Sequence, residues 1–155
     1  RAEKGVRMHT DQFHPEGPDN LLITSVDAAL AGQNTLLAAE SLGYGGVIIG
    51  LVRYEAAEVA KLFNLPDYTY PVFGMALGVP NQNHPVKPRL PLEAVVFEES
   101  YQEQTPEVIE AFDRVQTAYA GARATDTWSQ RLAAQFGQEE PAATAELLKK
   151  HQLEK

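Results

Sequence analysis

The sequence predicts an α+β fold on three observations. Two short runs rich in β-branched residues and bounded by glycine, at 45–51 and 71–80, are typical of strands. An alanine-rich run at 27–42 and a shorter amphipathic run at 55–63 are typical of helices. Beyond residue 104 the pattern is helical throughout. Strands and helices therefore mix in the first two thirds of the chain, and helices alone follow.

This pattern divides the 155 residues into three expected segments. Residues 1–20 are rich in charge, glycine and proline, which predicts a linker or loop. Residues 21–104 hold the predicted strands, and residues 105–155 form a helical extension. Because the chain starts at Arg1 and not at Met, we expect it to be a fragment of a longer protein.

The first helix is predicted at 27–42. Thr24 to Asp27 places a hydroxyl three residues before a carboxylate, which indicates a capping arrangement at the N-terminus. Gly43 follows the run and is the expected left-handed cap. Apolar residues occupy most of the helix circumference, so the helix is expected to be buried or to lie in an interface.

Three strands are predicted. The runs 45–51 and 71–80 are apolar enough to be buried on both faces, and 94–97 could pair as a further strand. Gly43 to Gly46 is not a dinucleotide-binding fingerprint, because that motif follows a strand and opens a helix, whereas here a helix ends and a strand begins. Between the first two strands, the helix at 55–63 is expected to turn Val59, Leu62 and Phe63 inward.

Three C-terminal helices follow. Thr105 and Pro106 are typical of a helix start, and a break is expected from Gly121 to Thr125. Either Thr125 or Asp126 is expected to cap the next helix, and Pro141 to start the last one. The expected apolar stripes consist of Val108, Phe112, Val115 and Tyr119 in the first helix and of Trp128, Leu132 and Phe136 in the second.

Composition excludes several classes of function. The formal charge of −8 and a pI near 4.9 argue against binding the nucleic-acid backbone. The chain has no cysteine, which excludes disulfides, thiolate nucleophiles and iron–sulfur ligation. No apolar run approaches the roughly 18 residues of a membrane span, and no secretory leader opens the chain, so we expect a cytoplasmic protein without a membrane partner. No metal site is expected, because the histidines lack ligand spacing: His9, His14, His84 and His151.

Lys87-Pro88-Arg89-Leu90-Pro91 is the most informative stretch. Pro88 fixes its own φ and keeps Lys87 out of the helical region, so the backbone is expected to be extended. Residues i and i+2 of an extended segment face the same way, and Lys87 and Arg89 are therefore expected to project toward one point, as a dianionic phosphate requires. The alternative is ordinary surface charge.

Four stretches together resemble a known family. They are 27–46, 73–80, 87–91 and 126–129, the last reading Asp-Thr-Trp-Ser. In this order they are similar to the oxygen-insensitive NADPH nitroreductases and NADPH–flavin oxidoreductases of the nitroreductase A branch. The resemblance implies a nitroreductase-like fold, with a mostly antiparallel sheet flanked by helices and a helical C-terminal extension. It spans about residues 20–150 and implies that the N-terminal part of the family core, with its His-Arg-Ser-x-Arg segment, is absent.

The resemblance also implies FMN as cofactor, NADPH as electron donor and a homodimer. Arg53, just beyond the first strand, matches an arginine near the nicotinamide approach, and Arg123 lies in the loop that holds the extra phosphate of NADPH. Without the resemblance, Arg123 could equally be a solvated loop charge, and Ile48 and Ile49 plain core. The implied FMN-binding residues are Ile48, Ile49, Gly50 and Leu51 against the ring, and Lys87, Pro88 and Arg89 around the phosphate.

Three departures from the family pattern are visible. Leu51 stands where many relatives have a second glycine, and its side chain is expected to crowd or tune the flavin face. The loop from Tyr119 to Asp126 is shorter and carries one arginine, and Glu140 replaces a frequent arginine. The preference for NADPH over NADH therefore stays open.

The function implied is an FMN-dependent NAD(P)H oxidoreductase that reduces nitroaromatics, quinones or flavins by ping-pong hydride transfer. No catalytic side chain is expected, because the cofactor carries the chemistry. The alternative is a non-catalytic fragment or helical interface module that binds flavin only with its N-terminal half. A further option is an enzyme of the same fold acting chiefly on free flavin, chromate or azo dyes.

Overall fold

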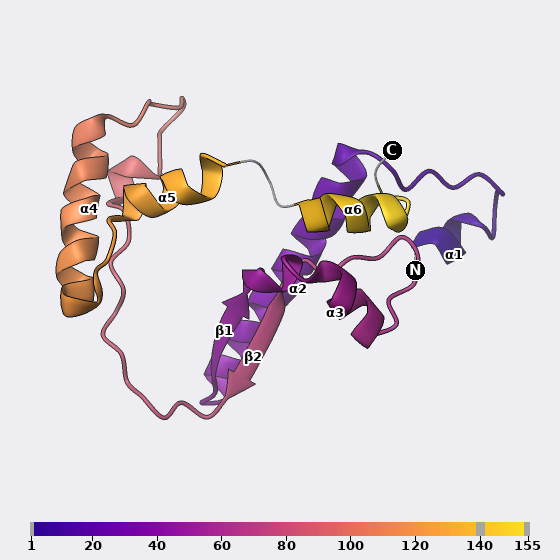
Figure 1. Cartoon of the computed structure of the whole chain (residues 1–155), viewed down its shortest axis with the longest axis horizontal. Coiled ribbons are helices and arrows are strands. Elements are labelled where there is room, and N and C mark those ends of the chain that lie inside the picture. Colours follow the sequence, from indigo (N-terminus) through magenta and orange to yellow (C-terminus); the bar gives the residue numbers. More distant parts are fainter. Residues whose placement is uncertain (1, 139–141, 154–155) are drawn as a thin grey trace. The chain divides into compact units, whose positions relative to one another are not determined.

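The computed structural model describes residues 2–138 and 142–153. The chain divides into two compact units. Unit 1 comprises residues 1–82 and 141–155, and unit 2 comprises residues 83–140. The chain thus leaves unit 1 after the strand β2, Gly74–Gly78, and comes back to it with the last helix, α6, Ala142–Lys150 (Figure 1).

Unit 1 is organised along the helix α2, Pro18–Ser41. It starts nine residues before the predicted boundary, after Gly17, whose φ is 117°. The expected cap at Thr24 to Asp27 is wrong, because the Thr24 hydroxyl donates to the Asn20 carbonyl at 2.9 Å, a bond made inside a continuing helix. Gly43, with φ 85°, confirms the predicted left-handed residue beyond the helix.

The predicted loop at 1–20 contains some helix. The short helix α1 covers Ala2–Val6, and the last three residues of the segment open α2. Arg7, just beyond this helix, forms an ion pair with Glu3 inside it, with Nε 2.8 Å from a carboxylate oxygen. The three-segment division itself stays a prediction.

The sheet of unit 1 pairs β1, Gly45–Ile49, with β2, Gly74–Gly78, in antiparallel register. Both strands were predicted, but each is shorter than its apolar run, since residues Gly50–Arg53 turn into the 3-10 helix η1. The helix α2 packs on this pair (Figure 1). A Leu36 methyl group fills the space above Gly46.

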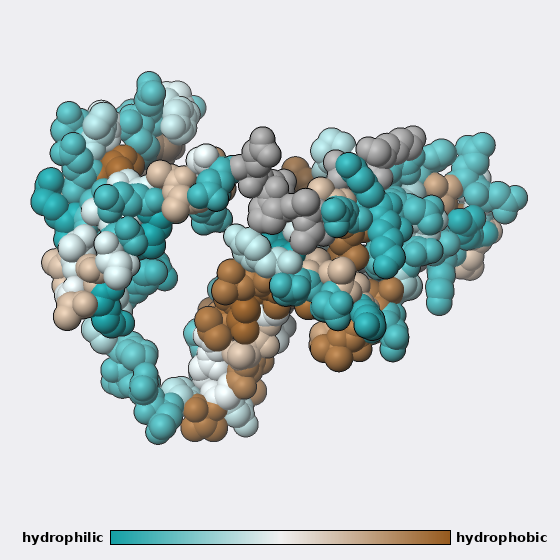
Figure 2. All heavy atoms as spheres, viewed as in Figure 1, coloured by the Kyte–Doolittle hydropathy of each residue, from teal (hydrophilic) through white to brown (hydrophobic). Residues whose placement is uncertain are grey.

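Burial of these strands on both faces is contradicted. Val47 is 56% exposed and Ile48 is 44% exposed, because two strands and one helix leave much of the sheet uncovered. Figure 2 shows hydrophobic atoms gathered over the β1 and β2 part of unit 1. Helix α2 is equally open: Gly32 is its one buried residue among those described. Of the two expectations for this helix, burial within the chain is wrong, and an interface stays a prediction.

The same helix overturns the expectation about apolar length. Within the described part of the chain, α2 alone is long and apolar enough to cross a bilayer by length and composition. Core and interface helices of water-soluble proteins pass the same test, so this property does not assign a membrane location.

The core of unit 1 joins two helices that are far apart in the sequence. Helix α3, Ala56–Leu62, confirms the predicted helix at 55–63, and α6 covers Ala142–Lys150. Pro141, the predicted start of the last helix, lies outside the described residues. Ala56, Ala60 and Leu147 form the buried cluster between them.

The inward face predicted for α3 is wrong in part. Leu62 is 74% exposed and Phe63 is 68% exposed, whereas the small residues Ala56 and Ala60 face α6. Small side chains allow α6 to approach closely, which an apolar pattern alone does not indicate. A backbone hydrogen bond then holds the end of α6, because the Tyr68 N–H donates to the His151 carbonyl at 3.0 Å.

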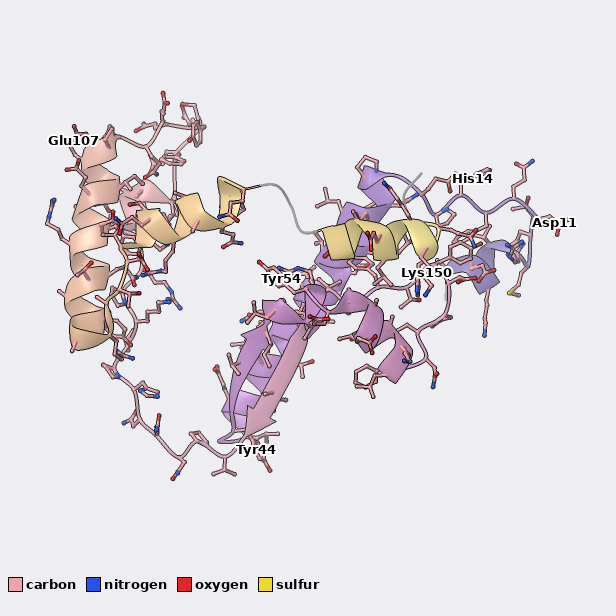
Figure 3. The ribbon with its side chains drawn as sticks, viewed as in Figure 1. Asp11, His14, Tyr44, Tyr54, Glu107 and Lys150 are labelled. Carbon is pink, nitrogen blue, oxygen red and sulfur yellow. The ribbon has the colours of Figure 1, made fainter. Side chains whose placement is uncertain are left out.

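Unit 2 is built on α4, Pro106–Ala120, and α5, Trp128–Phe136. The predicted start at Thr105 and Pro106 is confirmed, and Figure 3 shows Glu107 in the first turn of α4. Phe112 and Trp128 join the two helices edge to face, with ring centroids 5.0 Å apart.

Three expectations for unit 2 are corrected. The strand predicted at 94–97 is absent, because Leu92–Ala94 forms the 3-10 helix η2 after Pro91. Thr127 caps α5, with its hydroxyl accepting from the Gln130 N–H at 3.2 Å, in place of Thr125 or Asp126. The packed faces also differ from the expected stripes: Val115 and Phe136 are exposed, and Gln116 is buried instead.

Candidate functional site

The predicted ring-binding residues lie at the end of β1. Ile48 pairs with Met75 and Ile49 with Gly74, and Gly50 opens η1. Ile49 is 37% exposed and Leu51 is 71% exposed, so an apolar surface faces outward at this corner of unit 1. These residues are not the plain core that they could have been, because the structure leaves their side chains open.

Arg53 ends η1 and is tied to its own unit. Its Nη1 donates to the Val72 carbonyl at 2.8 Å, just before β2. Both terminal nitrogens lie over Gly50, where an added Cβ would stand 3.4 Å from each. The Arg53 carbonyl accepts a hydrogen bond from the Thr144 hydroxyl of α6 at 3.2 Å. The guanidinium is exposed and has further N–H groups, so it can also meet an anion.

The Lys87-Pro88-Arg89 segment lies in unit 2. Residues 82–91 form neither helix nor strand, as the prolines predict. Along the segment the side chains alternate: Lys87 and Arg89 are exposed, whereas Pro88 and Leu90 are half-buried. This alternation agrees with the expectation that the two cations share one side of an extended backbone.

Two residues of α4 hold this segment. Gln116 donates from Nε2 to the Pro88 carbonyl at 2.9 Å, and the Tyr119 hydroxyl donates to the Pro85 carbonyl at 3.1 Å. Tyr119 was predicted to belong to an apolar stripe of this helix, and no role was predicted for Gln116. The available signal was a glutamine one turn after Phe112 on the packed face of the helix.

The two cations are not neutralised within the chain. Among the residues that the structure describes, neither Lys87 nor Arg89 forms an ion pair. In a chain with a net charge of −8, an exposed pair of unpaired cations two residues apart is a suitable site for an anion.

Arg123 also lies in unit 2. It ends the 3-10 helix η3, Gly121–Arg123, which fills the predicted break between α4 and α5. Its side chain is exposed, and Ala124 closes the turn with an N–H bond to the Gly121 carbonyl at 3.0 Å. Glu140, the other departure from the family pattern nearby, lies outside the described residues.

The structure therefore brings together part of the predicted set in each unit. Ile48 to Leu51 and Arg53 share one corner of unit 1, and the other four residues, Lys87, Pro88, Arg89 and Arg123, belong to unit 2. Their convergence on one ligand stays a prediction.

Unit 1 also has a cavity that the sequence analysis missed. It has a volume of about 270 Å³ and lies beside the N-terminal part of α2. Phe13 and Tyr68, which meet edge to face at 5.0 Å, form one wall, and Tyr70 and Val72 form another. Among the described residues that line this cavity there is no lysine or arginine to bind a phosphate. Tyr44, which Figure 3 shows at the tip between α2 and β1, is not one of its lining residues.

Comparison with known proteins agrees with the resemblance. The Nitroreductase family matches residues 6–79, and the Nitroreductase family, C-terminal domain, matches residues 87–155. The NADPH-flavin oxidoreductase of Vibrio harveyi is 47% identical over 115 residues, which are 72% of this chain and 48% of that protein. The oxygen-insensitive NADPH nitroreductase of Salmonella typhimurium is 42% identical over 118 residues, covering 74% of this chain and 49% of that protein.

A solved structure shows the same fold. The NADPH:FMN oxidoreductase from Vibrio harveyi complexed with NAD+ matches with a TM-score of 0.85 and 38% identity, over 97% of this chain and 63% of that one. The chain spans about half the length of the two curated relatives named above. The predicted nitroreductase-like α+β fold is confirmed, and the chain belongs to the nitroreductase family, in its nitroreductase A-like branch.

Proposed function

We propose that this chain is part of an FMN-dependent NAD(P)H oxidoreductase that reduces nitroaromatics, quinones or flavins by ping-pong hydride transfer. The names of the relatives support the reaction class. The observation that carries the proposal is the exposed pair Lys87 and Arg89, which has no acidic partner within the described residues and lies on a proline-stiffened segment. A phosphate monoester is the ligand that this charge pattern suits best.

The residues present fit FMN. Lys87 and Arg89 would hold the phosphate, with Pro88 keeping them on one side of the backbone. The exposed apolar corner from Ile48 to Leu51 would lie against the ring, beside the Arg53 guanidinium that covers Gly50. When bound, FMN supplies the hydride chemistry, and the protein supplies position and electrostatics.

Arg53 and Arg123 are the proposed contacts for NADPH. Arg53 is held beside the ring-binding corner by its bond to the Val72 carbonyl, with guanidinium N–H groups to spare. Arg123 is an exposed cation on a short turn of unit 2. With one arginine in this loop, selection of NADPH over NADH rests on Arg123.

We further propose a cytoplasmic homodimer that has no nucleic-acid or membrane partner. The exposed apolar side chains of α2 support a subunit interface, because a single chain rarely leaves such a stripe in water. The acidic pI near 4.9 argues against nucleic acid. The exposed apolar residues along this helix are Leu22, Ile23, Val26, Leu30 and Leu37.

The test combines the intact mass with the visible spectrum of the purified protein. A yellow preparation whose flavin is released as FMN, and which oxidises NADPH with a nitroaromatic or quinone acceptor, supports the proposal. Failure to retain or rebind FMN in the full-length protein would contradict it. The intact mass states which length of chain was tested.

The openness of α2 favours a second candidate, a non-catalytic helical module. In this case the exposed stripe binds the N-terminal half of the family fold or a partner chain, and flavin binds only afterwards. A colourless preparation that takes up added FMN only when that half is supplied would favour the module over the enzyme.

A further inference from the structure

We propose that Gln116 is a positioning residue for the phosphate of FMN. In this role it holds the Lys87-Pro88-Arg89 segment so that both cations face the same ligand, and it does not touch the ligand itself. The inference rests on the function proposed above, and it assigns a role to a residue outside the predicted site.

The first argument is burial. Gln116 is 6% exposed, and the other buried residues described in unit 2 are the apolar Ala94 and Phe112. A buried amide costs free energy unless it is hydrogen-bonded, and its partner here is the Pro88 carbonyl at 2.9 Å. Loss of the Gln116 amide would leave this carbonyl without its side-chain partner.

The second argument is the position of that carbonyl. Pro88 has no N–H, so its carbonyl is the backbone hydrogen-bonding group that this residue contributes between the two cations. The bond fixes the peptide at the centre of the Lys87 to Arg89 stretch. Tyr119, three residues beyond Gln116 on α4, fixes the Pro85 carbonyl at 3.1 Å. Two anchors three residues apart on the segment oppose its rotation about its own axis.

Rotation of the segment about its own axis would change the direction in which the two cationic side chains project. In an extended backbone, Lys87 and Arg89 share a side only while the peptide between them keeps its orientation. Anchoring the segment before the ligand arrives removes an ordering cost from binding. Gln116 and Tyr119 therefore act on phosphate affinity through the segment that they hold.

The experiment compares two ligands that differ in the phosphate alone. In the full-length protein, Gln116→Met removes the donor at similar volume, and Tyr119→Phe removes the hydroxyl at the second anchor. Binding of FMN and of riboflavin is measured by flavin fluorescence titration. We expect Gln116→Met to weaken FMN about threefold to tenfold and to leave riboflavin within about twofold, with a smaller effect of the same kind for Tyr119→Phe.

Gln104→Met is the matched control. Gln104 also donates from Nε2 to a backbone carbonyl of unit 2, that of Ala94, which is not part of the Lys87-Pro88-Arg89 segment. Its loss is expected to leave the ratio of FMN to riboflavin affinity unchanged. Fluorescence of Trp128 checks that each variant keeps unit 2 folded, and Tyr119→Phe serves as the test if Gln116→Met does not fold.

Two results would overturn the inference alone: equal loss of FMN and riboflavin, which indicates a merely structural role, or unchanged FMN affinity in both anchor variants. A parent protein that binds FMN no more tightly than riboflavin would instead overturn the phosphate site and the proposed function with it.

Discussion

The two units are held together in different ways. Unit 1 closes its core with Leu147, which comes from the far end of the chain to meet Ala56 and Ala60. Unit 2 is continuous in sequence and depends on neighbouring helices, joined by the Phe112 and Trp128 rings. The proposed site divides in the same way, with an apolar ring surface in unit 1 and the cations in unit 2. Strand pairing positions the first, and side-chain hydrogen bonds from α4 position the second.

The largest expected effect is the loss of the unit 1 core. Leu147 is 3% exposed, and Leu147→Ala is expected to lower the free energy of unfolding by about 3 kcal/mol, since it leaves a cavity beside Ala56 and Ala60. Chemical denaturation followed by far-UV circular dichroism measures the loss. Trp128, the one tryptophan of the chain, reports on unit 2, and its transition is expected to stay in place.

Leu62→Ala is the control, because Leu62 is 74% exposed and its loss leaves no cavity. A shift of the Trp128 transition equal to that of the circular dichroism signal would show that the two units unfold together. This result would contradict the view that each unit is stabilised separately.

The next effect concerns the cations of unit 2. Arg89→Ala is expected to weaken FMN binding by about 1.5 to 3 kcal/mol, or about tenfold to a hundredfold, through loss of a charge-assisted phosphate contact. Flavin fluorescence titration measures it, and Arg114→Ala removes the same charge from an exposed position of α4 as a control. Unchanged FMN retention would remove Arg89 from the site.

A smaller effect tests local positioning in unit 2. Thr127→Ala is expected to cost about 1 kcal/mol of stability, because it removes the N-cap of α5. Denaturation followed by Trp128 fluorescence is the measurement. Thr125→Ala is the matched control, since the Thr125 hydroxyl donates to the Asp126 carboxylate and caps nothing. A larger loss at Thr125 would reinstate the cap that the sequence predicted.

Arg123 is expected to act on donor selection and not on stability. Arg123→Ala should raise the KM for NADPH about threefold to fivefold and leave that for NADH nearly unchanged, as for one exposed contact to the extra phosphate. Steady-state kinetics with both donors decides the question. Equal effects on the two KM values would show that this loop does not read the phosphate.

The mildest expected change depends on pH. The Asp113 carboxylate accepts from the Ser129 hydroxyl at 2.5 Å and from the Ser129 N–H at 2.9 Å, and these bonds lower the pKa of Asp113. A carboxyl with a lowered folded pKa stabilises the protein above its ordinary pKa, and this contribution is lost as the pH falls through the folded pKa.

We therefore expect Asp113→Asn to be less stable than the parent at neutral pH. The difference should narrow as the pH falls below the ordinary carboxyl pKa of about 4 and through the lower folded pKa of Asp113. Trp128-detected denaturation at several pH values measures both curves, with Asp126→Asn as the control. A difference that stays constant down to pH 2 would assign the role of Asp113 to shape and not to charge.

Local signals predicted much of the fold. Pro106 and Gly121 bracket α4, and Gly43 follows α2, because each residue is suited to one backbone conformation. The predictions were wrong where the surrounding structure overrides the conformational preference of a single residue. Thr24 is a capping residue by type, yet it bonds within a longer helix that Pro18 begins. Val95 and Val96 favour a strand, but they follow a 3-10 turn set by Pro91 and have no partner strand among the described residues.

The site was predictable to a similar extent. The alternate exposure of Lys87 and Arg89 follows from proline geometry, which a sequence displays directly. Gln116 was not found, because periodicity ranks an amide at a packed position below the neighbouring Val115, and the partner carbonyl of Pro88 is distant in sequence. The open faces of β1 were not foreseen either, since an apolar run does not state how many strands will join it.

The return of α6 to unit 1 has a consequence for synthesis. As the chain is made, residues 83–140 emerge contiguously and can pack as soon as α5 is available. The segments at 1–82 are made earlier but keep Ala56 and Ala60 uncovered until α6 has been translated. Residues 1–82 thus emerge before unit 2 but complete their core after it, so a ribosome stalled before α6 would leave Ala56 and Ala60 open to chaperones and proteases.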